Sequence, residues 1–478
     1  MKRLRLLIAV LCLSVLVVAG CSGSSNSVLP PGQSAALSMT ITDTPPAGVT
    51  VLSFEVTVNG AVLNPGNVQL VSKPAQIEVR QLETESAFLS TVNVPAGTYQ
   101  SITLNLTNPE LTIFNQSGAA VGGCANNAVC ELKPSAAGNV TYTGVPFPVT
   151  LQGGAPSGLQ VDVNVANLIS NSLTVDFTAT GALSVAQLPL PGQPANHLDD
   201  LDDLIGTVQS LDGTNKTFTL HTTTTDYPIQ TDANTEYEFE ACAANDFTCL
   251  QANQVVKVDA KMLAGGVFLA KEIGFEDDAA DDELEGVIYK IDGPAQFEMV
   301  VLDELRPVNN VSVGNPVVVT LDGMCSQSAC FQVQAENLKS VVPGILQNAF
   351  DSASDTSQLL PGQTVEVRLM APVTPATATA PASASTNRVR LRMTQFTANV
   401  KAGSIVPPNF SVNNLPSLFT DATPPILEIH VQTSTRTVFH GVSDVTGLAD
   451  GNTVSLRGLL FSNGTNPPEL IAKKVRKR

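Results

Sequence analysis

Alternation of apolar and polar residues with a period of two is the feature that most constrains the fold of this chain. It recurs along the whole sequence, for example in SFEVTVNG from Ser53, LQVDVNV from Leu159 and RVRLRM from Arg388. Successive side chains of a strand point to opposite faces, so this pattern indicates strands that bury one face. An apolar period of 3.6 residues persists almost nowhere. The sequence therefore predicts an all-β protein with at most a few short helices.

The first folded block is expected over residues 35–190. Its strand patterns are separated by Pro-Ala-Gly turns, in which proline fixes φ and glycine permits the reversal, and this order suits an antiparallel β-sandwich. Three segments carry a family resemblance: TDTPPAG from Thr42, VPAGTYQSITL from Val94 and APSGLQVDV from Ala155. On these segments the block resembles the bacterial domain-of-unknown-function family 4382.

Beyond an acidic linker at residues 191–204 the chain repeats itself. The repeated segments are LQANQVVKV from Leu250, VSVGNPVVV from Val311, LLPGQTVEV from Leu359 and LADGNTVSL from Leu448, with two similar starts, IGTVQSLD from Ile205 and EGVIYKID from Glu285. The unit resembles the domain-of-unknown-function family 5666, whose copies often occur in tandem on exported proteins. Repeats of about five strands predict three or four small OB-like β-barrels. Their expected bounds, with a second acidic linker at 277–285, are 205–276, 286–342, an irregular 343–400, and 401–478.

The N-terminus carries an export signal. Positive residues precede an apolar run over residues 6–20, which at about 1.5 Å per residue spans roughly 22 Å, short for a bilayer core of about 30 Å. Val18-Ala19-Gly20-Cys21 resembles a bacterial lipobox. Residues 1–20 are therefore expected to be a lipoprotein signal peptide, Cys21 the lipidated residue, and 21–34 a flexible tether. Ordinary cleavage beside an incidental cysteine is the alternative. Ser22 in place of Asp implies sorting to the outer membrane.

Six cysteines outside the signal fall into three close pairs. Because export leads to an oxidising compartment, this spacing predicts three local disulfides. A zinc site would need distant pairs to converge, and neither a zinc site nor a redox motif is supported, since no pair has CxxC spacing. The predicted bonds are Cys124–Cys130, Cys242–Cys249 and Cys325–Cys330.

The charge excludes one class of partner. The formal net charge is −18, and removing the three basic residues of the signal makes it −21. A chain this acidic repels phosphates, so no nucleic acid partner is expected. The one basic cluster is KKVRKR at residues 473–478, interpreted as a solvated strand end, with a contact to anionic lipid or glycan as the alternative.

No catalytic pattern stands out. There is no HExxH, G-x-S-x-G, Walker or dinucleotide motif, and His430 and His440 are interpreted as surface or barrel-wall residues. We therefore expect no enzyme activity and no cofactor, with an unrecognised hydrolase as an alternative. Asp281, Glu283 and Glu285 before Gly286 loosely mimic a calcium loop, which leaves a calcium-dependent module open; a solvated linker is the preferred interpretation.

The favoured function is a non-enzymatic, lipid-anchored protein of the bacterial envelope that serves as a surface binding or structural module. The membrane, through lipid on Cys21, and an envelope protein or polysaccharide are the expected partners. Flat aromatic platforms for sugar are not indicated, because the chain has no tryptophan and its five tyrosines are scattered. Core positions are expected for these tyrosines.

Overall fold

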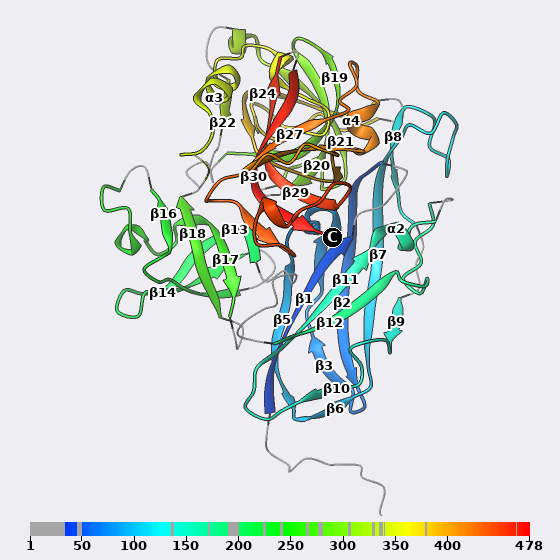
Figure 1. Cartoon of the computed structure of the whole chain (residues 1–478), viewed down its shortest axis with the longest axis vertical. Coiled ribbons are helices and arrows are strands. Elements are labelled where there is room, and N and C mark those ends of the chain that lie inside the picture. The colour runs from blue at the N-terminus through cyan, green and yellow to red at the C-terminus, as the bar shows by residue number, and fades with distance from the viewer. Residues whose placement is uncertain are drawn as a thin grey trace, which may run out of the picture.

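A computed structural model gives the architecture (Figure 1). It describes residues 34–44, 50–134, 138–170, 173–189, 200–222, 226–239, 242–263, 267–275, 281–304, 307–326, 330–333, 338, 340–377, 380–464 and 466–478. The predicted signal peptide and Cys21 lie outside these ranges, as do most of the tether and the first part of each acidic linker. The all-β prediction is confirmed: two sheets form the N-terminal block, and closed barrels follow.

The N-terminal block is a sandwich of two sheets. The first sheet has the order β12-β11-β1-β5 and consists of β1 (Ser34–Thr44), β5 (Ala87–Pro95), β11 (Ser157–Asn164) and β12 (Leu183–Pro189). The second has the order β3-β2-β7-β8, with β4 and β9 paired to β2 and β7; its strands are β2 (Thr50–Asn64), β3 (Val68–Val71), β4 (Ala75–Glu78), β7 (Ser101–Asn115), β8 (Ala128–Leu132) and β9 (Asn139–Tyr142). One pairing departs from the predicted antiparallel order, since β1 and β11 run parallel. Alternation shows which face of a strand is buried but not the direction of its neighbour.

Short elements complete the sandwich. They are β6 (Gly97–Tyr99) paired with β10 (Val149–Leu151), the 3-10 turn η1 (Val79–Leu82) and α2 (Val165–Leu168). Phe54, Val56 and Val58 of β2 are at most 1% exposed and fill the space between the sheets. Glu55, on the opposite face of the same strand, is also buried, at 7% exposed. Another domain therefore covers the outer face of this sheet.

Within the described residues, three closed barrels follow the sandwich. Barrel 1 comprises β13 (Asp200–Asp212), β14 (Thr217–His221), β15 (Asp226–Gln230), β16 (Glu236–Glu238), β17 (Val255–Met262) and β18 (Phe268–Phe275). Barrel 2 comprises β19 (Glu283–Gly293), β20 (Gln296–Asp303), β21 (Pro316–Leu321), β22 (Phe331–Val333), β23 (Thr364–Leu369) and β24 (Ala382–Leu391). Barrel 3 comprises β25 (Met393–Val400), β26 (Asn409–Asn413), β27 (Ile429–Gln432), β28 (Val438–His440), β29 (Thr453–Asn463) and β30 (Asn466–Lys477).

The three barrels share one strand order. In each, the first strand lies between the second and the fifth, and a parallel pairing of the third strand with the sixth closes the barrel: β15–β18, β21–β24 and β27–β30. Closure removes exposed sheet edges, as expected for small barrels. The finer prediction of an OB-like type stays a prediction.

A shared turn explains the sequence repeat. Before the fifth strand of each barrel, an Asp side chain caps a short 3-10 turn, a buried leucine follows, and an amide oxygen then accepts a backbone N–H three residues earlier. The capping residues are Asp246, Asp355 and Asp444, and the amide bonds run from Gln251 N to Gln254, from Leu360 N to Gln363 and from Ala449 N to Asn452. These turns fix where each barrel's fifth strand begins.

The boundary between the predicted repeats 286–342 and 343–400 is wrong. Both segments belong to barrel 2, because β19 pairs with β23 and β21 pairs with β24. The repeat motif occurs twice in this barrel: Asn315 accepts from Ser312 N before β21, just as Gln363 accepts from Leu360 N before β23. The same local turn occurs before two strands of one barrel, so the number of sequence motifs exceeds the number of barrels.

Both segments interpreted as acidic linkers are partly strand, since residues 200–204 belong to β13 and residues 283–285 to β19. The Ala/Thr/Pro-rich stretch at residues 372–386 also enters a strand, β24, at Ala382. Ala382, Ala384 and Thr386 are buried, so small residues here fill a barrel wall. Two longer helical turns, α3 (Gly344–Asp351) and α4 (Ser417–Thr420), lie between strands of barrels 2 and 3. No helix in the described residues could cross a membrane.

The sulfurs of the three predicted cysteine pairs lie at bonding distance. The S–S distances are 2.07 Å for Cys124–Cys130, 2.03 Å for Cys242–Cys249 and 2.26 Å for Cys325–Cys330. Each pair closes a local loop of 5 to 7 residues' separation within one domain. None of these bonds therefore joins one domain to another.

Candidate functional site

The C-terminal strand β30 runs into the middle of the molecule, where Figure 1 marks the chain end. Its basic residues are not a solvated strand end, which corrects the interpretation from sequence. Lys473 is 3% exposed, and its Nζ lies 2.5 Å from Oδ2 of Asp259 in barrel 1. Arg476 and Arg478 donate to the carbonyl oxygen of Glu83 in the sandwich, at 3.2 and 2.7 Å. Charges near the chain end thus join barrel 3 to two other domains.

The sandwich contributes an acidic plug, defined here as residues 83–86, between η1 and β5. All four plug residues are at most 8% exposed. Glu85 forms a buried ion pair with Arg457 of β29, and Glu83 accepts a hydrogen bond from Thr397 Oγ1 of β25 at 2.7 Å. Burying carboxylates is costly unless cations and donors meet them. The plug therefore fits barrel 3 specifically.

Other contacts between the domains are aromatic at one place and hydrogen bonds at others. Phe88 of β5 packs between the rings of Tyr227 and Phe268 of barrel 1, with centroids 5.9 and 4.8 Å away. Between barrels 2 and 3, Gln363 donates to the carbonyl of Leu460 at 2.7 Å. The sandwich also hydrogen bonds to barrel 2 through Thr112 Oγ1 and Gly314 O and through Gln81 Nε2 and Leu302 O. Every domain thus has contacts that fix it relative to the others.

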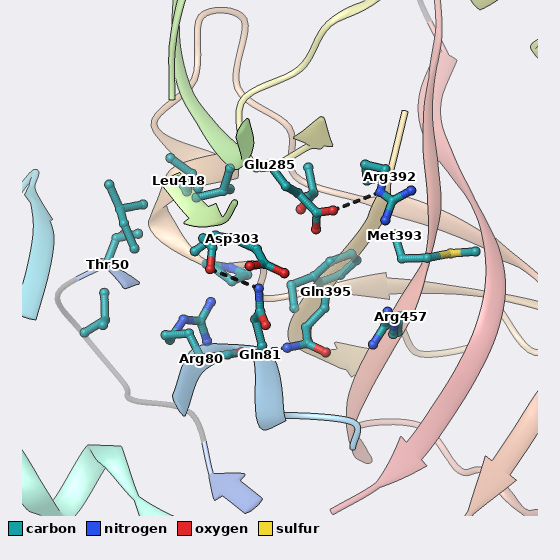
Figure 2. A pocket seen from close by; sticks show the side chains of 18 of the residues that line it. Thr50, Arg80, Gln81, Glu285, Asp303, Arg392, Met393, Gln395, Leu418 and Arg457 are labelled. Carbon is teal, nitrogen blue, oxygen red and sulfur yellow. Dashed lines mark hydrogen bonds and ion pairs between the residues drawn. The ribbon is translucent and has the colours of Figure 1, made fainter. Parts of the chain in front are cut away.

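A cavity of about 130 Å³, here the junction cavity, lies where the four domains meet. Figure 2 shows Arg392 paired with Glu285 on one side, at 2.9 Å, and Arg80, Gln81 and Gln395 on the other. Gln395 links these sides to the plug region, since its amide donates to the Arg80 carbonyl at 2.6 Å. Within the described residues, three arginines and three carboxylates line the cavity: Arg80, Arg392, Arg457, Glu85, Glu285 and Asp303.

The volume and the charges of the junction cavity suit it to holding a few water molecules. At about 30 Å³ per water, its volume holds only a few molecules. Its charges are balanced, and no histidine or cysteine of the described chain lines it. The junction cavity is therefore a small polar space with a balanced set of charged groups where the domains meet.

A row of glutamates crosses the sandwich face that barrel 2 covers. Glu78, Glu55 and Glu110 stand side by side on β4, β2 and β7. Burial, followed by the neighbouring charges of Glu78 and Glu110, raises the pKa of Glu55 to about 8. Burial also raises the pKa of Glu78, although the N–H groups of Phe54 and Arg80 donate to its carboxylate at 3.0 and 2.9 Å and oppose that rise.

A second hollow is a cleft of about 1370 Å³, here the three-domain cleft. Its walls are formed by the end of β7 in the sandwich, by the second half of β19 and the turn at residues 356–361 in barrel 2, and by two loops of barrel 3. Leu418 of α4 lines both this cleft and the junction cavity. An apolar cluster of Leu52, Tyr289, Val300 and Leu418 contributes to both hollows: Leu52 lines the junction cavity, and Tyr289 lines the cleft. The contacts that fix the domains therefore also fix the cleft.

The carboxylates of the suggested calcium loop have other partners. Glu285 pairs with Arg392, Glu283 pairs with Arg388, and Asp281 lies 3.4 Å from Arg368. These residues belong to or precede β19, and their arginines come from β23 and β24 and the residue just after β24. A Cβ on Gly286 would lie 2.5 Å from the Val300 carbonyl, so close strand approach accounts for that glycine. No group of three or more metal-ligating side chains was found in the described part of the chain.

The described histidines, His221, His430 and His440, lie on three different strands, β14, β27 and β28. His430 is half-exposed on β27 with Nε2 3.6 Å from Glu428, and His440 is buried on β28. Of the five tyrosines expected in core positions, Tyr99, Tyr227 and Tyr289 are buried, whereas Tyr142 and Tyr237 are half-buried. Sequence reasoning missed the acidic plug and its cations; the signal available was the pairing of an acidic ETES segment with a basic C-terminus.

Family comparisons match the first two domains. The model described as Domain of unknown function (DUF4382) matches residues 34–187, and Domain of unknown function (DUF5666) matches residues 205–274. These ranges coincide with the sandwich and with barrel 1. No curated protein matches the chain. Residues 34–187 and 205–274 thus match the two families in the order that the sequence resemblances implied.

Proposed function

We propose that this protein is a non-enzymatic, lipid-anchored module of the bacterial envelope that binds a partner on a preformed surface. One observation carries the proposal: the buried plug contacts and ion pairs fix four domains around one junction, and a large cleft opens between three of them. A cleft held open in advance loses little conformational freedom when a ligand enters, which favours affinity.

Anchoring is supported by the sequence. The VAGC segment ending at Cys21 would place lipid at the start of a Ser/Gly/Pro-rich tether, and several acyl chains on one cysteine would hold firmly. The first described strand is β1 (Ser34–Thr44), and about a dozen residues lie between Cys21 and this strand in the sequence. Ser22 after the cysteine favours the outer membrane as its location.

A binding role is preferred to the alternatives because of where the charged groups lie. The acidic residues near Gly286 engage arginines, which disfavours the calcium-dependent alternative at that place. A hydrolase would need a carboxylate or histidine facing an open hollow together with a placed partner, and the junction cavity offers only paired charges.

The test is thermal unfolding of residues 22–478 with envelope polysaccharides, envelope protein extracts fractionated to single components, and calcium. A ligand at a hundred times its dissociation constant adds about 2.7 kcal/mol to the folded state, which is readily seen as a higher melting temperature. A rise with a polysaccharide or a purified envelope protein would support the module. Turnover of a substrate by the purified chain, abolished by one carboxylate substitution, would overturn the non-enzymatic assignment.

A further inference from the structure

We infer that the three-domain cleft binds an uncharged oligosaccharide segment of an envelope polysaccharide. The inference rests on the proposed binding function and names its ligand class. The cleft's volume, about 1370 Å³, exceeds the 300–1,000 Å³ typical of small-ligand pockets. It therefore suits a chain of several linked rings better than a single metabolite.

The walls of the cleft combine apolar surfaces with amides and hydroxyls. Pyranose rings have the same two aspects, C–H faces and a rim of hydroxyl groups. The apolar lining includes Phe114, Ile426, the exposed Leu427 and paired prolines such as Pro424 and Pro425. The polar lining includes the amides Gln116, Asn127, Asn463 and Asn466, with hydroxyls such as those of Ser357 and Thr423.

One amide in this wall has an acceptor without a donor. The Oε1 atom of Gln116, just beyond the end of β7, is buried and has no hydrogen-bond partner among the described residues. A buried acceptor without a donor is unfavourable by about 1–3 kcal/mol. A ligand hydroxyl donating to Gln116 Oε1 would remove that cost.

The charges of the cleft argue for a neutral ligand. Lys290 is engaged by Asp292 and Glu298, at 2.6 and 2.7 Å. Glu428 pairs with Lys401. The remaining ionised lining group is Asp421, which is exposed. The cleft thus has no cation left for a phosphate or an acidic sugar, and its one uncompensated charge repels them.

A polypeptide ligand fits this cleft less well. An extended peptide gains most of its affinity by pairing with a free strand edge. Loops and turns form most of the cleft wall. Strand β7 is paired on both sides, with β2 and β8, and Lys290 and Ile291 of β19 pair with β20. Strands β29 and β30 reach the cleft where they pair with each other. Side-chain amides and hydroxyls are therefore its main hydrogen-bonding groups.

The experiment measures binding of neutral hexaoses (cellohexaose, maltohexaose and mannohexaose) to residues 22–478 by calorimetric titration. A tri-galacturonate and a proline-rich hexapeptide serve as the charged and peptide probes. The variant Gln116→Leu keeps the side chain's size but removes its amide, and we expect it to weaken hexaose binding about fivefold to tenfold, which corresponds to about 1–1.4 kcal/mol. The variant Gln209→Leu, at an exposed amide of β13 outside the cleft, is the matched control and should bind as the wild type does.

Binding of at least one hexaose, weakened by Gln116→Leu and unchanged by Gln209→Leu, would support the inference. Leu427→Ala provides a second cleft variant that touches no hydrogen bond and should also weaken binding. If only the peptide or the galacturonate bound, with the same dependence on Gln116 and Leu427, the assignment of an uncharged oligosaccharide would fall while the binding module stood. If neither cleft variant changed the affinity for the hexaose, the cleft would be the wrong site. If no probe bound and no envelope component raised the melting temperature, both proposals would fall.

Discussion

Replacing Lys473 by Met is expected to destabilise the folded protein by about 3–5 kcal/mol, because the substitution removes the cation that faces a carboxylate buried between barrels 1 and 3. Lys473 and Asp259 are 3% and 5% exposed, and their charged atoms lie 2.5 Å apart. An exposed ion pair contributes at most about 1 kcal/mol. The magnitude therefore separates a buried contact between domains from the solvated strand end that the sequence suggests.

Urea unfolding of four proteins provides the assay: wild type, Lys473→Met, Asp259→Leu and the double variant. Each single variant should lose several kcal/mol, whereas the double variant should regain more than half of the summed loss, because an apolar pair leaves no buried charge. Lys133→Met is the matched control. Lys133 pairs with Glu110 at 3.0 Å, but its side chain is 70% exposed, so its removal should change the free energy of unfolding by under about 1 kcal/mol. A loss below about 1 kcal/mol in Lys473→Met, or additive losses in the double variant, would refute the reasoning.

Three further outcomes follow from the structure. Glu55→Gln should stabilise the protein by about 2 kcal/mol at pH 8.5 and leave it unchanged near pH 4. The reason is that the pKa of Glu55 is raised to about 8 in the folded wild type, which therefore loses stability as the pH rises from the ordinary glutamate value of 4.5 through 8. Chemical denaturation across this pH range measures the difference, and an equal stability of both proteins at pH 8.5 would contradict the prediction. Replacing Cys242 and Cys249 together by Ala should cost about 2–2.5 kcal/mol, the chain-entropy value for a short loop, and leave the domain contacts intact; calorimetry under non-reducing conditions checks this, and dissociation of barrel 1 from the rest would count against a purely local role. Cys21→Ser should abolish acyl labelling in cells and leave an uncleaved precursor, whereas retained label on that variant would rule out the lipobox interpretation.

The all-β fold was predictable because strand alternation is a local property that a half-buried face imposes on any sequence. The cysteine pairs were predictable for a similar reason, since short separations leave few partners. The number of barrels was not fixed in the same way: the turn around Asn315 and the turn around Gln363 use the same amide-to-backbone bond at two places in one barrel. The same turn forms wherever a strand start needs its backbone N–H capped by an amide side chain, so the number of such motifs does not assign strands to a barrel.

The domain contacts were not predictable from the same signals. Glu55 alternates correctly for a solvated face, and only the arrival of barrel 2 buries it. Lys473 likewise occupies a strand position typical of the surface, but Asp259 approaches it from a different domain. Alternation identifies the polar face of a strand; which polar faces meet depends on contacts between residues hundreds of positions apart. The cleft and its open amide at Gln116 depend on those contacts too.

Small-angle scattering of residues 22–478 in solution is the most direct test of the claim that the acidic plug and its cations fix four domains as one body around the cleft. The account predicts a scattering curve fitted by the single arrangement of Figure 1, with the bell-shaped normalised profile of a compact particle. It also predicts that Arg457→Met, which removes the cation facing Glu85, broadens the profile. A wild-type curve that requires many different arrangements of the sandwich and barrels would contradict the central claim.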